Sequence, residues 1–159
     1  MITKRMDPKD LDSAATIHSE AFPRQRLSHD WLSCSLKAFP RTLCFIIEEK
    51  QQILGYIIWS QKSGFRPEVV LELEQIAVLP NHQGHGVGAQ LIRESLALVK
   101  EQLSSVGSKL KHIVVSTRSD NHAQRLYRNA LGAEIEATIS DLYSADEVYM
   151  IARDIGNRI

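Results

Sequence analysis

The sequence has few of the residues that build disulfide scaffolds, metal centres and membrane spans. Only two cysteines occur among 159 residues, Cys34 and Cys44, and their spacing fits neither a CxxC pair nor a metal site. A disulfide framework is therefore excluded, and a reducing, cytoplasmic location is the simplest expectation. No apolar run reaches membrane-spanning length, and residues 1–10 lack the apolar core of a signal peptide.

The chain also lacks an excess of either charge. Its 19 lysines and arginines balance 19 aspartates and glutamates, so the formal net charge is zero. Without a basic surplus there is no electrostatic argument for a nucleic-acid or anionic-membrane partner. Hydrophobic residues at 43% and charged residues at 24% are ordinary globular values. The length fits one domain, residues 1–159, with room for a substantial core.

Hydrophobic periodicity and turn residues divide the chain into strands and helices. Strands are expected over 2–6, 43–49, 53–61, 71–78, 111–117, 133–139 and 147–153, and helices over 7–22, 28–39, 87–103 and 121–131. This order predicts an α/β fold, a mixed sheet with helices on its faces. We expect His18 to be half-buried, Cys44 to lie in the core, and Cys34 to pack within its helix rather than act as a nucleophile.

The most informative stretch is 71–92, where an alternating strand leads through a glycine-rich turn into a long amphipathic helix. Gly84, Gly86 and Gly88 occupy alternate positions where that helix begins. Glycine permits a tight bend and a close approach to the main chain, and the free amides of a first helical turn attract anions. The stretch therefore predicts a pyrophosphate site.

Three other interpretations of the glycines fit the sequence less well. A dinucleotide fingerprint expects the glycines directly after the strand and an acid at the end of the next strand, and neither feature is present. A Walker loop needs Gly-Lys-Ser/Thr, which does not occur. A plain strand-to-helix turn rarely needs three alternating glycines.

Two motifs resemble the GNAT superfamily of acyl-CoA-dependent N-acetyltransferases. The first is Gln83-x-x-Gly86-x-Gly88 preceded by Ile76-Ala77-Val78-x-Pro80, and the second is Asn121-x-Ala123-x-x-x-Tyr127 followed by Leu131-Gly132-Ala133. The resemblance implies a mixed, mostly antiparallel sheet flanked by helices on both faces. It also implies acetyl-CoA as co-substrate, bound by Ile76, Ala77, Val78, Gln83, Gly84, His85, Gly86, Val87, Gly88, Ala89, Asn121 and Tyr127.

The resemblance further implies acetyl transfer to a primary amine by direct attack in a ternary complex. Tyr127 is expected to protonate the departing thiolate, although its apolar helix face also fits a packing role. A lysine amine has a pKa of about 10.4, so a general base must take its proton. Glu72 and Glu74 would share a strand face with Ile76 and Val78, opposite a face formed by Leu71, Leu73, Gln75 and Ala77.

Glu72 is the better candidate for the base, because it matches the catalytic glutamate of the histone-acetylating branch of the superfamily. A main-chain amide near Val78 is a candidate donor to the oxyanion. Both acids lie far along the strand from Val78, so either one needs strand curvature, a bulge or a water relay.

The sequence leaves two classes of function open. The chain is either an acetyltransferase or a non-catalytic acyl-CoA-binding regulatory module, and the presence of Glu72 and Tyr127 favours the enzyme. The acceptor is expected to be a small-molecule amine or a peptide or protein amine, in a pocket formed by 22–39, 63–67 and 140–146. No metal is expected, because His82 and His85 lack a third ligand. A homodimer is left open.

Overall fold

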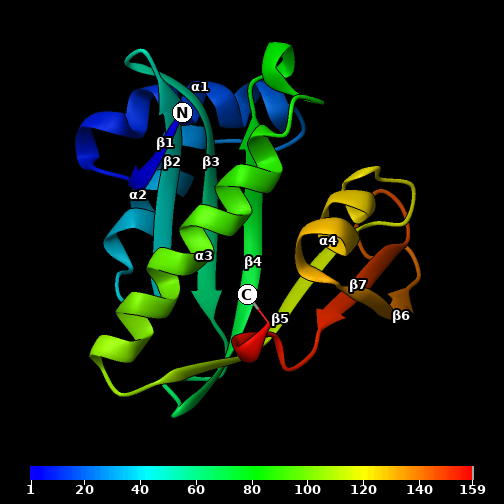
Figure 1. Ribbon diagram of the computed structural model, residues 1–159. Helices are drawn as coiled ribbons and strands as arrows, with labels where there is room; N and C mark the ends of the chain where they lie inside the picture. Colours follow the sequence, from blue (N-terminus) through cyan, green and yellow to red (C-terminus); the bar gives the residue numbers. More distant parts are fainter. Residues whose placement is uncertain (159) are drawn as a thin grey trace.

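One seven-stranded sheet forms the centre of the computed structural model, which describes residues 1–158 (Figure 1). Its spatial order is β1-β2-β3-β4-β5-β7-β6. All neighbouring strands are antiparallel except β4 and β5, which run parallel. The strands are β1 (Ile2–Arg5), β2 (Thr42–Glu49), β3 (Gln52–Gln61), β4 (Glu68–Val78), β5 (Lys109–Arg118), β6 (Glu134–Ile139) and β7 (Glu147–Ala152).

Helices cover both faces of this sheet, so the predicted α/β class and layer arrangement are confirmed. Figure 1 shows α3 and α4 in front of the sheet, with α1 and α2 behind it. Three short 3-10 turns are also present among residues 1–158. One lies before α1, one before the glycine loop and one near the end of the described chain. The helices are α1 (Leu11–Ala21), α2 (Ser28–Lys37), α3 (Val87–Ser105) and α4 (Ala123–Leu131), and the turns are η1 (Pro8–Asp10), η2 (Pro80–His82) and η3 (Ile155–Asn157).

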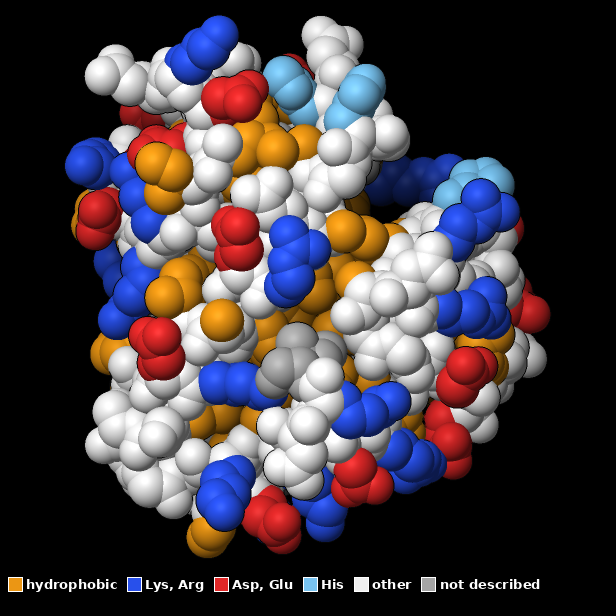
Figure 2. Space-filling model, viewed as in Figure 1, with side chains coloured by type: hydrophobic (Ala, Val, Ile, Leu, Met, Phe, Trp, Pro, Cys, Tyr) orange, Lys and Arg blue, Asp and Glu red, His pale blue; other side chains and the backbone are white. Residues whose placement is uncertain are grey.

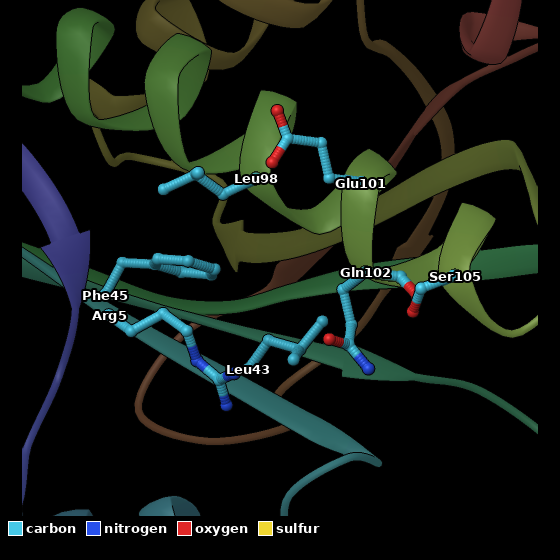
Figure 3. A pocket seen from close by; sticks show the side chains of 7 residues that line it. All are labelled: Arg5, Leu43, Phe45, Leu98, Glu101, Gln102 and Ser105. Carbon is cyan, nitrogen blue, oxygen red and sulfur yellow. The ribbon is translucent and has the colours of Figure 1, made fainter.

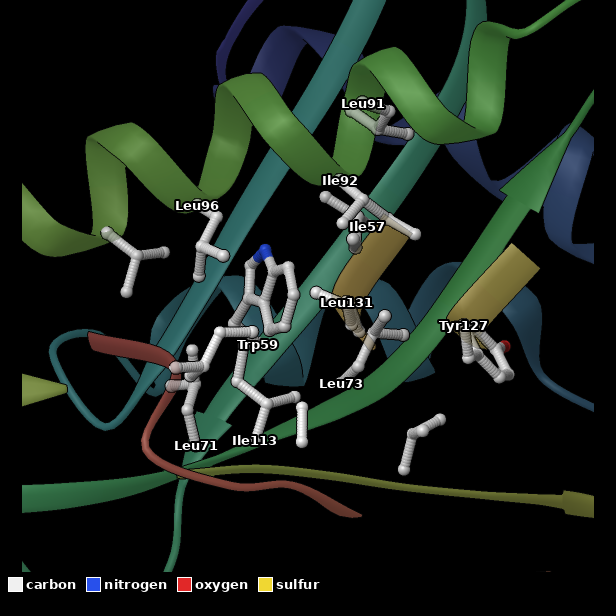
Figure 4. Close-up of a cluster of buried hydrophobic side chains, with 14 of the residues drawn as sticks. Ile57, Trp59, Leu71, Leu73, Leu91, Ile92, Leu96, Ile113, Tyr127 and Leu131 are labelled. Atoms are coloured by element: carbon white, nitrogen blue, oxygen red, sulfur yellow. The ribbon is translucent and has the colours of Figure 1, made fainter. Parts of the chain in front are cut away.

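Each face of the sheet has its own apolar cluster. On the α3 side, Leu91, Ile92 and Leu96 pack over Ile57 and Trp59 of β3 (Figure 4). The only polar atom of the Trp59 indole is satisfied there, because its Nε1 donates to Ser95 Oγ at 2.9 Å. The opposite cluster joins α1 and α2 to the backs of β2, β3 and β4. Burial of each large apolar side chain contributes about 1.5–3 kcal/mol to the free energy of unfolding. The two clusters together therefore hold the helices against the two faces of the sheet.

A β-bulge at Glu74 changes which residues of β4 share a face. Leu73 and Gln75 pair with adjacent residues of β3, so Glu74 is the extra residue. Leu73 packs in the α3-side cluster, whereas Ala77 packs in the α1-side cluster and Gln75 bonds to Tyr56 of that cluster. The predicted uninterrupted alternation is therefore wrong beyond the bulge, because one extra residue shifts a period-two pattern to the other face.

β4 and β5 separate after a short paired stretch. Their register runs from Glu68 opposite Lys109 to Glu72 opposite Val114, although β4 continues to Val78. Figure 1 shows the two strands diverging from that point, which leaves a V-shaped gap at the open end. The strand edge of β4 from residue 73 to residue 78 therefore has no partner on the β5 side among the described residues.

The structure changes two of the single-residue expectations. His18 is fully buried rather than half-buried, and both ring nitrogens have partners there, with Ser28 Oγ at 2.8 Å and Gln25 Oε1 at 2.9 Å. Cys34 is exposed rather than packed, whereas Cys44 lies in the core as expected. Burial raises the pKa of the Cys44 thiol to about 12. No helix within residues 1–158 is long and apolar enough to span a membrane.

Candidate functional site

The glycine loop leaves several backbone amides without a protein partner. Gly84 and Gly86 have φ values of 77° and 81°, a left-handed conformation that costs other residues about 1–2 kcal/mol. The helix α3 starts at Val87, and its first paired amide is Gln90 N, which donates to Gly86 O at 3.0 Å. Among the described hydrogen bonds, the amides of residues 87–89 therefore have no acceptor, which suits an anion.

The third glycine and Gln83 connect this loop to its neighbours. A Cβ on Gly88 would lie 3.3 Å from Leu126 Cδ2, so the glycine allows α3 to approach α4 closely. Gln83 Nε2 donates to Val78 O at 3.0 Å and ties the loop to the end of β4. The predicted coenzyme residues 76–78 and 83–89 therefore lie together at the open end of the gap.

The amide of Val78 faces this gap. Leu79 N donates to Leu54 O on β3 at 2.8 Å, so the Leu79 amide points toward β3. Successive amides of a strand point in opposite directions, and the Val78 amide therefore points toward the side where β5 has separated.

The two residues of the second motif have different surroundings. Asn121 Oδ1 accepts a hydrogen bond from Ala123 N at 2.8 Å, so this side chain caps α4. Tyr127 is 6% exposed and lies at the α4 end of the apolar cluster (Figure 4). Burial, and then the negative charge of Glu147, raise the pKa of Tyr127 to about 12. The phenol is therefore neutral, the form that can donate a proton, throughout the physiological range.

Glu72 and Glu74 lie on the same face, as predicted, but the bulge places Ile76 and Val78 on the opposite face, so that part of the prediction is wrong. The two acids also have different surroundings. Glu72 forms an ion pair with Lys62 at 3.0 Å and sits at the last position where β4 and β5 are paired. Glu74 lies in the separated part of β4 and accepts a hydrogen bond from Ser60 Oγ. Of the two, Glu74 is nearer to the open end of the gap along the strand and has no cation within ion-pair distance among residues 1–158.

A third acid, Glu147, was not predicted from the sequence. It is the first residue of β7, is 6% exposed, and lies opposite Arg118 in the β5–β7 register. Among residues 1–158 its carboxylate has no ion pair or hydrogen bond, and its oxygens keep some contact with solvent. The only sequence signal was an acid at the start of the otherwise apolar segment 147–152.

A partly buried polar network fixes the α1–α2 connection against β4. Gln75 Oε1 accepts hydrogen bonds from Tyr56 Oη at 2.7 Å and from Trp31 Nε1 at 3.0 Å. Gln75 Nε2 donates to Gln25 Oε1, which also bonds to His18. Satisfied buried networks are rigid, so this connection has a defined position beside the bulge.

Two of the three predicted acceptor segments meet. Arg24, from segment 22–39, donates to Ser144 of segment 140–146 at 2.8 Å. Figure 2 shows a hollow between the end of the molecule that holds the glycine loop and the part formed by α4, with basic side chains on its far wall. The third segment, 63–67, instead lines a separate hollow of about 510 Å³ at the closed end of the gap.

Another hollow, of about 250 Å³, lies beneath the C-terminal half of α3 and away from this gap (Figure 3). Its lining residues are Arg5, Leu43, Phe45, Leu98, Glu101, Gln102 and Ser105. Within residues 1–158 no group of three or more His, Cys, Asp or Glu side chains is arranged to hold a metal ion.

Several solved structures that share this fold are acetyltransferases. The chain superposes with a TM-score of 0.76 on the ribosomal-protein-S18-alanine N-acetyltransferase from Escherichia coli, at 18% identity over 96% of this chain and 93% of that one. An aminoglycoside 6'-N-acetyltransferase complexed with coenzyme A gives a TM-score of 0.76 at 14% identity, with 98% of each chain covered. A spermidine N-acetyltransferase chimera from Vibrio cholerae and hSSAT gives 0.74 at 18% identity, with 97% of each covered.

At these identities the superpositions establish the fold alone. No curated protein sequence matches the chain significantly. A sequence model of the acetyltransferase (GNAT) family, however, matches residues 11–133, which include both motifs and every predicted site residue. This match favours an enzyme over a regulatory module, and the chain belongs to the acetyltransferase (GNAT) family.

Proposed function

We propose that this protein transfers the acetyl group of acetyl-CoA to a primary amine by direct attack within a ternary complex. The observation that carries the proposal is the group of unpaired amides at residues 87–89, at the open end of the gap beside which Tyr127 lies. We further propose that the reaction takes place in the cytoplasm, which agrees with the two free thiols, Cys34 and Cys44.

The residues present fit a pyrophosphate. No heavy atom lies within 4 Å of a Cβ built on Gly84 or Gly86, so the main chain there is open to a ligand. The amides of residues 87–89 and the positive end of the α3 dipole would hold the phosphates. The unpaired edge of β4, residues 76–78, would hold the pantetheine arm by main-chain hydrogen bonds, as a missing strand would.

Each chemical requirement has a residue near the gap. The Val78 amide would stabilise the negative charge that develops on the thioester oxygen. Tyr127, neutral and largely buried, would donate the proton that the departing thiolate needs. Glu74 is our preferred base, acting through water, because it lies in the separated part of β4, whereas Glu72 is held by Lys62. The assignment of Glu72 from the resemblance remains the competing hypothesis.

The test is release of free thiol from acetyl-CoA in the presence of a panel of amines, with the acetylated product identified by mass spectrometry. We expect release above the rate without amine for at least one primary amine. The Tyr127→Phe variant, which keeps the ring packing, is the matched control and should lose most of that rate. Coenzyme A binding without release for any amine in a broad panel would contradict the proposal.

A further inference from the structure

Two arginines from distant parts of the chain converge on one neutral oxygen. Arg24, in the α1–α2 connection, and Arg118, at the end of β5, each donate through Nη1 to Ser144 Oγ at 2.8 Å. The two guanidinium nitrogens are therefore separated by at most twice that distance. Ser144 lies in the β6–β7 connection, so three separate elements form the cluster.

The charges of this cluster are only partly balanced. Asp120 binds the Nε and Nη2 of Arg118, both at 3.1 Å, and neutralises that guanidinium. The hydrogen bond from Arg118 and, to a lesser extent, the charge of Arg24 hold the pKa of Asp120 below its usual value. Among the described residues no carboxylate lies within ion-pair distance of Arg24, whose guanidinium donates to the Ser144 hydroxyl.

Ser144 occupies the position that an anion would take. A guanidinium carries five donors suited to carboxylate and phosphate oxygens, and two guanidiniums at this spacing can bind two oxygens of one such group. A single hydroxyl satisfies only one donor of each arginine. An arriving carboxylate or phosphate would replace hydrogen bonds to a neutral hydroxyl with hydrogen bonds to a negatively charged group, and would balance the charge of Arg24.

The cluster lies where an acceptor would enter. Arg24 and Ser144 belong to the two acceptor segments that meet, and Arg118 ends the strand that borders the gap. Glu147, opposite Arg118 in the register, has no ion-pair partner within the described chain and lies close enough to affect the pKa of Tyr127. The site thus combines cations at its rim with a largely buried glutamate near the proposed acid.

We propose that Arg24, Arg118 and Ser144 form an anion subsite that selects amines carrying a carboxylate or phosphate group. The ammonium of such an acceptor would enter toward Glu147 and Tyr127, while its anionic group would bind at the rim. This subsite disfavours polycationic amines such as aminoglycosides and spermidine. Two enzymes that share the fold are named for these substrates. The inference rests on the proposed amine acetylation and specifies its substrate class.

The test compares matched amines with the coenzyme-A-loaded protein. The probes are the common α-amino acids with their carboxamides, which lack the negative charge, and phosphoethanolamine with ethanolamine. Ligand-observed NMR measures binding, and thiol release from acetyl-CoA measures turnover. We expect at least one anionic amine to bind about tenfold or more tightly than its neutral partner, a difference of about 1.4 kcal/mol. Tighter binding of the amino acid than of its carboxamide would identify a carboxylate as the anion, and tighter binding of phosphoethanolamine than of ethanolamine would identify a phosphate.

Three variants make the test specific. Arg24→Gln should remove most of the preference for the anionic amine and leave binding of the neutral partner unchanged. Arg26→Gln removes the same charge from the same connection without contact to Ser144, and should keep the preference. Ser144→Asp places a carboxylate between the arginines and should exclude anionic amines only. Melting temperatures would show that all three variants are folded.

The outcomes separate the two proposals. Equal binding of charged and neutral partners, or a preference that survives Arg24→Gln, overturns the anion subsite. Turnover of amines without any preference for the anionic partners also contradicts the subsite, but it leaves the proposed acetyl transfer standing. A preference that depends on Arg24, without turnover of any amine, supports the subsite and contradicts acetyl transfer.

Discussion

Replacing Gly86 by alanine should weaken coenzyme A binding far more than it weakens the fold. Gly86 precedes α3 with φ 81° and ψ 2°, in the left-handed region. A methyl group there has no heavy atom within 4 Å, so it meets no steric conflict within the protein. The variant therefore has two separable effects, a backbone strain in the free protein and a methyl group on the surface that we propose contacts the pyrophosphate.

The strain has a known size and a matched control. An L-residue in the left-handed conformation costs about 1–2 kcal/mol, which should appear as a loss of unfolding free energy in urea. Gly107, in the turn between α3 and β5, has φ 77° and likewise no heavy atom within 4 Å of an added Cβ. Gly107→Ala should therefore lose a similar unfolding free energy, although it lies at the opposite end of α3 from the glycine loop.

Calorimetric titration with coenzyme A then distinguishes the two sites. We expect Gly86→Ala to bind at least about tenfold more weakly, about 1.4 kcal/mol, because the methyl group keeps the phosphates away from the amides. Gly107→Ala should bind as the wild-type protein does. If both variants bind coenzyme A with unchanged affinity, or if both lose affinity equally, the glycine loop is not the pyrophosphate site.

Three further predictions concern the proposed chemistry. Tyr127→Phe should lower turnover about 100-fold with little change in coenzyme A affinity. An equally active variant would leave Tyr127 as a packing residue. Turnover of the wild-type protein should show no loss from deprotonation of Tyr127 until the pH approaches 12. Glu74→Gln should remove the acidic limb of the pH–rate profile and Glu72→Gln should retain it, whereas the reverse result would restore Glu72 as the base. Glu147→Gln should lower the pKa of Tyr127 in a spectrophotometric titration, because it removes a negative charge that disfavours the phenolate; an unchanged titration would show that the carboxylate does not act on Tyr127.

The helices, the strands and the glycine loop were predictable because their signals are local. The helix α4 ends before Gly132, a common C-terminal stop, and α2 begins at the expected Ser28, although Leu27 is its N-cap and the Ser28 hydroxyl bonds to His18. The turn at Lys50 and Gln51 is the hairpin expected between two apolar runs. In each case a few neighbouring residues determine the backbone, so a single sequence contains enough information.

The buried state of His18 and the surroundings of Glu147 depend instead on distant residues. The burial of His18 is tolerated because Gln25 and Ser28 bond to its ring nitrogens, and no spacing within its own helix indicates those partners. Glu147 is a strand-initial acid, a position that is usually solvated, and only the register of β7 between β5 and β6 encloses it. The arginine cluster combines three connections whose meeting likewise depends on the complete fold.

The bulge at Glu74 explains why the strand before the loop was misread and why it can serve the site. An unbroken alternation would have placed Gln75 beneath α3, in an apolar cluster without partners for its amide, at a cost of about 1–3 kcal/mol. The extra residue turns Gln75 toward Tyr56 and Trp31, where its amide accepts two hydrogen bonds, donates one to Gln25 and fixes the α1–α2 connection that carries Arg24. It also leaves Ile76 and Val78 packed against the α3-side cluster. The same local irregularity therefore orders both sides of the gap, the coenzyme side through the strand edge and the acceptor side through Gln75.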